Sequence, residues 1–114
     1  MSSNFTQEAE VVTPPKAGEI ETLAVTTSST ALQTLPSSGN RRYWRFLLIP
    51  DSAVGVGSVA GYIHFGNDAI GAASAANAAP VLEGHFLDVV LAAGSCFRVI
   101  GTAAATLKYW PTSD

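Results

Sequence analysis

The chain has 114 residues, a formal net charge of −3 and a pI of about 5.2, and this length fits a single domain. Hydrophobic residues make up 47% and charged residues 13%, whereas about 25% charged residues are usual in a soluble domain. The longest apolar run, residues 46–49, is far shorter than the roughly 20 residues of a membrane span. We therefore expect one globular domain without a membrane partner, whose weakly charged surface is partly covered by another molecule.

The first 20 residues differ in composition from the rest of the chain. They contain three glutamates, the pair Pro14-Pro15 and few bulky aliphatic side chains. Consecutive prolines hold the backbone extended, and no basic segment followed by an apolar segment marks a signal peptide. We interpret residues 1–20 as an extended N-terminal arm whose apolar residues Phe5, Val11 and Val12 dock on a partner. A disordered tail is the alternative.

From residue 21 onward, apolar and polar residues alternate with the two-residue period of β-strands, and turn residues separate the segments. The predicted strands are residues 22–26, 30–35, 41–49, 58–65, 86–91, 96–100 and 105–110. Residues 70–79 are rich in Ala, Gly and Ser and predict a loop with room for one helical turn, while residues 80–84 lead into the next strand. Seven or eight short strands without a helix predict an all-β fold, an antiparallel β-sandwich or jelly roll over residues 21–114.

The alternation also predicts which side chains share the apolar face of each strand. These residues are Leu23, Val25, Trp44, Phe46, Leu48, Val59, Ile63, Phe65, Leu107 and Tyr109. The lone Cys96 lies in an apolar run, which favours a small buried side chain over a reactive thiol. A single cysteine also excludes an intrachain disulfide and a cysteine-based metal site.

Basic and aromatic residues are concentrated at one strand start. Three of the six basic residues lie here, beside two aromatic ones, in the order Arg41, Arg42, Tyr43, Trp44 and Arg45. Arg, Tyr and Trp are typical anchors of protein interfaces. A solvated strand start and a surface for single-stranded nucleic acid are the alternatives, and the negative net charge disfavours the second. We predict an interface that contains Arg41, Arg42, Tyr43, Arg45 and Trp110, and we hypothesise that the acidic arm pairs with it between neighbouring subunits.

The motifs of enzymes and cofactor sites are weak. Residues 55–60 match the GxGxxA dinucleotide pattern, but a strand and not a helix is predicted after them. His64 and His85 lack the spacing and the further ligands of a metal site, and no GxSxG nucleophile motif is present. The sequence therefore predicts a protein without enzymatic activity, cofactor or metal.

Five segments follow one another in an order that resembles small β-sandwich virion proteins of tailed bacteriophages. They are residues 26–31 leading to Leu35-Pro36, the strand ending at Ile49, residues 63–69, the Ala/Ser-rich loop into residues 80–84, and the strands through residues 99–100 and 105–107. The likeness covers roughly residues 22–110. The N-terminal arm, Arg41-Arg42 and the ending at residues 109–111 depart from the pattern.

This resemblance implies a structural, non-enzymatic component of the virion. The chain is similar to a capsid decoration, or cement, protein. Such a protein lies on the capsid surface and binds the major capsid protein, often as a homotrimer. The resemblance implies no nucleic-acid partner. Two alternatives remain open. One is a structural protein of the tail, neck or fibre base. The other is a carbohydrate-binding β-sandwich that uses Tyr43, Trp44, Tyr62 and Trp110.

Overall fold

The computed structural model describes residues 19–36 and 43–112, and these residues form eight strands and no helix. The strands are β1 (Glu21–Val25), β2 (Gln33–Thr34), β3 (Tyr43–Pro50), β4 (Val59–Gly66), β5 (Ala79–Leu82), β6 (Leu87–Val90), β7 (Cys96–Gly101) and β8 (Ala105–Pro111). No segment within the described ranges forms a helix that could cross a membrane.

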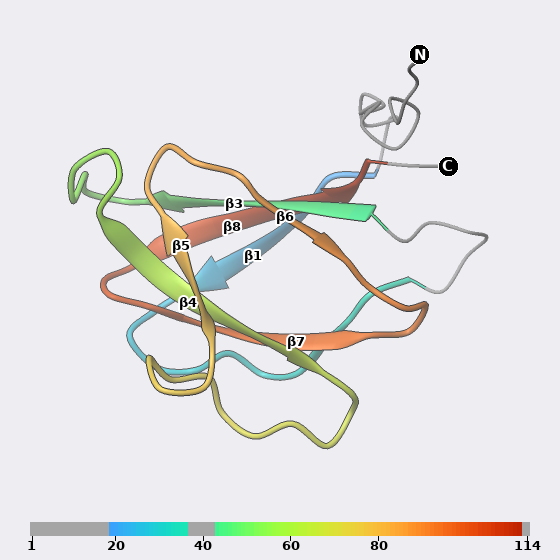
Figure 1. Ribbon diagram of the computed structural model, residues 1–114. Helices are drawn as coiled ribbons and strands as arrows, with labels where there is room; N and C mark the ends of the chain where they lie inside the picture. Colours follow the sequence, from blue (N-terminus) through green and yellow to red (C-terminus); the bar gives the residue numbers. More distant parts are fainter. Residues whose placement is uncertain (1–18, 37–42, 113–114) are drawn as a thin grey trace, which may run out of the picture.

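The strands form two four-stranded antiparallel sheets, with the orders β1-β8-β3-β6 and β2-β7-β4-β5. Figure 1 views them from the side, with the first sheet above the second. Four antiparallel pairs are nested within one another: β1 with β8, β2 with β7, β3 with β6, and β4 with β5. This is the order of a long hairpin that has folded over on itself, which is the jelly-roll arrangement. The predicted all-β sandwich is therefore confirmed.

The structure corrects the prediction in two places and confirms the loop predicted before residue 79. Residues 79–82, read as a loop end and a connection, form the edge strand β5, where Pro80 is tolerated because an edge strand has a side without ladder bonds. Residues 71–78 contain turns but no helical turn. The strand predicted at residues 30–35 shrinks to β2, because Thr30 bonds Val99 on β7 through both its N–H and its hydroxyl oxygen instead of continuing a regular ladder.

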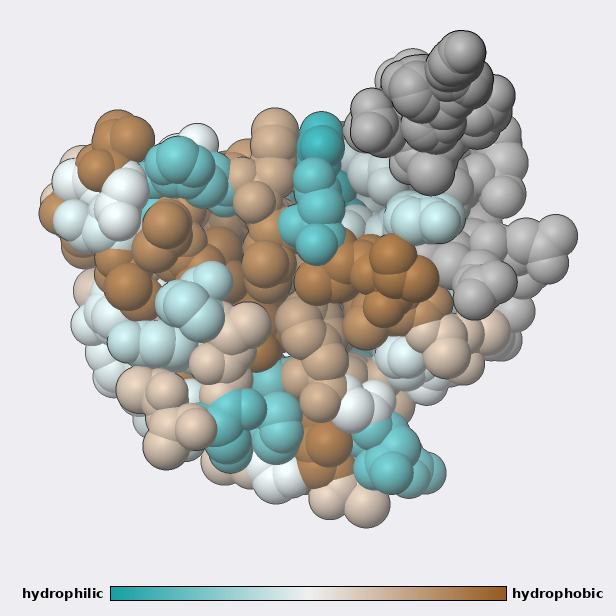
Figure 2. Space-filling model, viewed as in Figure 1, coloured by the Kyte–Doolittle hydropathy of each residue, from teal (hydrophilic) through white to brown (hydrophobic). Residues whose placement is uncertain are grey.

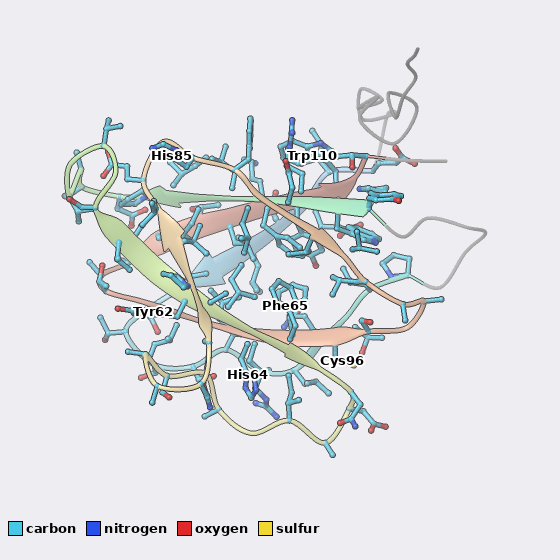
Figure 3. All side chains as sticks on the ribbon, viewed as in Figure 1. Tyr62, His64, Phe65, His85, Cys96 and Trp110 are labelled. Carbon is cyan, nitrogen blue, oxygen red and sulfur yellow. The ribbon has the colours of Figure 1, made fainter. Side chains whose placement is uncertain are left out.

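The core lies between the two sheets and contains most of the side chains that the alternation predicts. Four aromatic rings bridge the sheets, with Phe46 and Tyr109 from the first sheet and Phe65 and Phe97 from the second. The ring centres of Phe46 and Phe97 are 5.4 Å apart, and those of Phe97 and Tyr109 are 5.1 Å apart. Figure 3 shows Phe65 between the sheets. These edge-to-face contacts add to the burial of apolar area that stabilises the sandwich.

A bulge in β4 changes the alternation at the start of that strand. The register with β5 shifts between Val59 and Gly61, and Ala60 is buried in place of the predicted Val59. Gly61 pairs with Gly101 on β7, and a Cβ on Gly61 would lie 2.6 Å from Leu48 Cδ2 in the opposite sheet. The two sheets therefore approach closely at this end, and only glycine fits there.

A loop packs on the outer side of the β2-β7-β4-β5 sheet. Arg98 on β7 donates hydrogen bonds to the carbonyl oxygens of Ile70 and Thr30, each at 3.2 Å. The N–H of Ala73 donates to the hydroxyl of Ser29 at 2.9 Å, and Ala73 is buried. These hydrogen bonds hold the connections before β2 and after β4 against this side of the sandwich.

Candidate protein interface

Three exposed apolar side chains lie on the outer face of the β1-β8-β3-β6 sheet, two others lie next to its strands, and Val54 and Val56 lie in the loop between β3 and β4. Seven large hydrophobic residues of the described chain are exposed: Ile20, Tyr43, Ile49, Val54, Val56, Phe86 and Val90. Tyr43, Ile49 and Val90 point outward from β3 and β6, Ile20 precedes β1, and Phe86 precedes β6. Figure 2 shows hydrophobic residues along the upper side of the molecule, interrupted by hydrophilic ones. A face of this kind is typical of a protein-binding surface.

Four side chains at the middle of this face form a connected cluster, which we call the Arg45 cluster: Arg45, Phe86, Asp88 and Trp110. The strand register brings them together, because Arg45 on β3 lies opposite Asp88 on β6 and opposite Trp110 on β8. Arg45 Nε donates to Asp88 Oδ1 at 2.7 Å, and Arg45 Nη2 donates to Asp88 Oδ2 at 2.9 Å. This two-bond geometry fixes the plane of the guanidinium.

The aromatic members complete the Arg45 cluster. The guanidinium carbon of Arg45 lies 4.3 Å from the centre of the Phe86 ring, a cation–π contact. The edge of one ring meets the face of the other between Phe86 and Trp110, with ring centres 6.0 Å apart. Figure 3 places Trp110 on the upper side of the upper sheet, away from the core residue Phe65. The cluster is therefore an ordered surface feature and not part of the core.

The charges of the Arg45 cluster are matched within it. The hydrogen bond that Arg45 donates to Asp88 raises the pKa of Arg45, burial acts in the opposite direction, and the negative charge of Asp88 raises the pKa further. The Arg45 side chain is 20% exposed, whereas that of Asp88 is 56% exposed. Arg45 is thus paired with a carboxylate and lies over the Phe86 ring, so a molecule that bound to this face would lose less side-chain entropy at Arg45.

Two further residues extend the surface along the strands. Tyr43 lies opposite Val90 in the β3–β6 ladder, next to the pair of Arg45 and Asp88 on the same face. The exposed fractions of Val90 and Phe86 are 59% and 51%. Tyr, Trp and Arg are the residue types that dominate binding energy at protein interfaces. The face therefore combines anchor residues, exposed apolar area and a fixed charge pair.

Three of the predicted interface residues lie in the described part of the chain, and the structure places all three on one face. Tyr43, Arg45 and Trp110 share this face. The other predicted residues lie outside the described part of the chain: Phe5, Val11, Val12, Arg41 and Arg42. Sequence reasoning overlooked Phe86, Asp88 and Val90, whose only local signal is their place on a predicted strand.

The four aromatic residues of the carbohydrate-binding alternative do not form one platform. Trp44 is 3% exposed and packs in the core against Tyr109. Tyr62 lies on β4 in the other sheet, and Figure 3 shows it far from Trp110. Only Tyr43 and Trp110 remain on a common face, so the geometry does not favour this alternative.

The reactive side chains are dispersed. The predicted burial of Cys96 is confirmed, and its Sγ lies 3.5 Å from the Thr34 hydroxyl oxygen. His64 lies on the lower sheet and His85 beside the upper sheet in Figure 3. No three His, Cys, Asp or Glu residues form a metal-binding group within residues 19–36 and 43–112. The GxGxxA segment leads into strand β4, as expected, and not into a helix.

A shallow cavity opens at the end of the sandwich where β4 meets the β6–β7 connection. It has a volume of about 400 Å³ and is lined by Phe65, Leu91, Asn67 and the turn at residues 92–95. The lining contains no charged residue. Nothing in the cavity identifies a ligand, so we take the outer face with the Arg45 cluster as the candidate site.

Comparisons with known proteins identify no relative. No family model, curated protein or solved structure matches the chain. The function must therefore be inferred from the residues and their arrangement.

Proposed function

We propose that this chain is a non-enzymatic structural component of a bacteriophage virion that binds the surface of the assembled capsid and stabilises it. The observation that carries the proposal is the outer face of the β1-β8-β3-β6 sheet, where anchor residues and exposed apolar area surround the Arg45 cluster. The jelly roll is compatible with this role because it is common in viral capsid proteins, although a fold alone does not define a function.

In this proposal the outer face docks on the major capsid protein. Phe86 and Val90 lose their exposed apolar area on binding, and the paired Arg45 and Asp88 need no rearrangement. A protein that binds only the assembled lattice stabilises that lattice by mass action. Many copies on one particle, or copies held together as a homotrimer, strengthen the effect because each additional contact becomes intramolecular.

The N-terminal arm has a second part in the proposal. Phe5, Val11 and Val12 would contact neighbouring capsid subunits, and Arg41 and Arg42 would meet acidic residues there or in the arm of another copy. These residues lie outside the described ranges, so this part rests on the sequence alone. Replacing Arg41 and Arg42 by glutamate should weaken both self-association and partner binding.

Binding to purified capsids tests the docking face with two matched substitutions. Val90→Asp places a charge on the proposed face, whereas Val56→Asp places the same charge on the loop between β3 and β4, where Val56 is 79% exposed. We expect Val90→Asp to weaken capsid binding at least about tenfold, corresponding to ~1.4 kcal/mol, and Val56→Asp to leave it unchanged. Equal binding of both variants and the unmodified chain would refute the docking face.

Particle stability tests the role itself. Capsids carrying the protein should withstand higher temperature or stronger osmotic shock than capsids from which it is missing. Equal resistance would overturn the stabilising role. Labelling the polypeptide on intact virions distinguishes the capsid surface from the tail, neck or fibre base. A protein of the tail, neck or fibre base would place the label at a single vertex or along the tail.

A further inference from the structure

The four edge strands differ in how their free backbone groups are protected. Natural sheets protect their edges with short strands, prolines, bulges or charges, because an open edge accepts another strand. β2 has two residues, β6 has four, and β5 contains Pro80 and pairs with the bulged strand β4.

β1 has fewer of these protections, because it has no bulge and its single charged residue is Glu21 at its start. Its five residues pair with β8 in an unbroken register from Glu21 to Val25. It contains no proline and no basic residue. Within residues 19–36 and 43–112, β8 is the only strand that pairs with it, so its second edge has no partner strand there.

We propose that the free edge of β1 pairs with β1 of a second copy of this chain, antiparallel and about a twofold axis. The two β1-β8-β3-β6 sheets would then form one continuous sheet. A twofold interface uses the same residues on both copies, so the strand must be complementary to itself.

The sequence of β1 meets this requirement. With Leu23 opposite Leu23 of the second copy, Glu21 faces Val25 and Thr22 faces Ala24. In this register no like charges lie opposite one another. Like charges in opposite positions would destabilise the pair. Thr22 and Ala24 are exposed and small, so they do not obstruct the approach of a second strand. The half-buried Leu23 side chains of the two copies would meet on the inner side and lose further contact with water.

The pairing does not depend on a role in the capsid, and it predicts a dimer instead of the trimer that the family resemblance implies. A contact along five residues is small, and small interfaces form transient complexes. We therefore expect dimers at high protein concentration, toward the ~1 mM end of specific affinities.

The experiment combines sedimentation equilibrium with residue-resolved amide hydrogen exchange on the full chain at about 10 μM and about 1 mM. At the higher concentration and a Kd near ~1 mM, about half of the chains are dimeric, so we expect a mean mass between those of monomer and dimer and about twofold slower exchange for the β1 amides that point away from β8. The amides of the other edge strand of the same sheet, β6, serve as an internal control and should not change.

A charge-reversal pair of variants makes the test specific. Combining Thr22→Lys with Ala24→Lys places lysines opposite one another across the twofold axis, at two exposed positions. Thr22 also lies opposite Lys108 on β8 and accepts a hydrogen bond from it, so the folded state of each variant is checked by its thermal unfolding. This variant should remain monomeric, as should the variant that combines Thr22→Glu with Ala24→Glu. An equimolar mixture of the two should recover the dimer, because lysine then faces glutamate. Val56→Lys, in the loop between β3 and β4 where the side chain is 79% exposed, is the control and should dimerise normally.

Several results would overturn the pairing. One is a monomer at every concentration, and another is association, including a trimer, without added protection of β1. Full protection of β1 in the dilute monomer would mean that another segment of the same chain fills the edge. The capsid proposal fails separately, because a protein that dimerises through β1 but does not bind capsids retains the pairing and loses only the proposed function.

Discussion

Replacing Gly61 by alanine tests the close approach of the two sheets. An added Cβ would lie 2.6 Å from Leu48 Cδ2 and 2.7 Å from the carbonyl oxygen of Ile100. Both distances are far below ordinary van der Waals contact. Leu48 is 1% exposed and packed in the core, and the Ile100 oxygen belongs to the backbone of β7. Neither neighbour can move without disturbing its surroundings.

We therefore expect Gly61→Ala to lower the free energy of unfolding by about 1–3 kcal/mol, the range for overpacking a well-packed core. For a domain of this size, 1 kcal/mol corresponds to roughly 4 °C in Tm, so the melting temperature should fall by about 4–12 °C. Urea unfolding followed by tryptophan fluorescence measures the change, and an unchanged m-value would show that the unfolded state is unaffected.

Gly71→Ala is the matched control. A Cβ at Gly71 meets no atom within 4 Å, so the substitution acts mainly on the unfolded chain. It should be neutral or stabilising by up to about 1 kcal/mol. If Gly61→Ala is as stable as the unmodified protein, or if both variants lose the same stability, the close approach of the sheets does not explain the glycine at position 61.

Three further predictions concern the core. Phe46→Ala should cost about 3–5 kcal/mol in urea unfolding because the ring is fully buried, whereas Phe86→Ala on the surface should cost about 1 kcal/mol or less; similar losses would contradict the assignment of core and surface. Burial, and then the charge of Glu21, raise the pKa of Tyr109, so the folded chain holds this proton more tightly than the unfolded chain. The resulting stability is complete below pH ~10 and is lost as the pH rises through the higher folded pKa, and Tyr109→Phe should reduce this alkaline loss in unfolding curves measured at several pH values. The Cys96 thiol should react with a thiol reagent only after unfolding, and rapid reaction of the native protein would show that it is accessible.

The local structure of most strands follows from the alternation of apolar and polar residues along each one. A strand exposes alternate side chains on opposite faces, so the pattern from Trp44 to Leu48 predicts both the strand and its buried side without knowledge of the neighbours. The same holds for Leu107 and Tyr109 on β8. The predicted burial of Cys96 also follows from its apolar neighbours. The exceptions arise where local pattern is weak, as in β5 with its central proline, or broken by a bulge, as at Val59.

The pairing of the strands, and with it the contacts between side chains distant in the chain, does not follow from any local pattern. Arg45 and Asp88 are 43 residues apart, and nothing in either segment indicates that the β3–β6 ladder places them opposite one another. The same strand pairing brings Phe86 to Arg45. The position of β1 at the edge of its sheet is known only from the strand order. The requirement for glycine at position 61 likewise comes from the opposite sheet. Side-chain alternation is a property of one strand, whereas the interface, the edge and the close approach depend on contacts between strands distant in the chain.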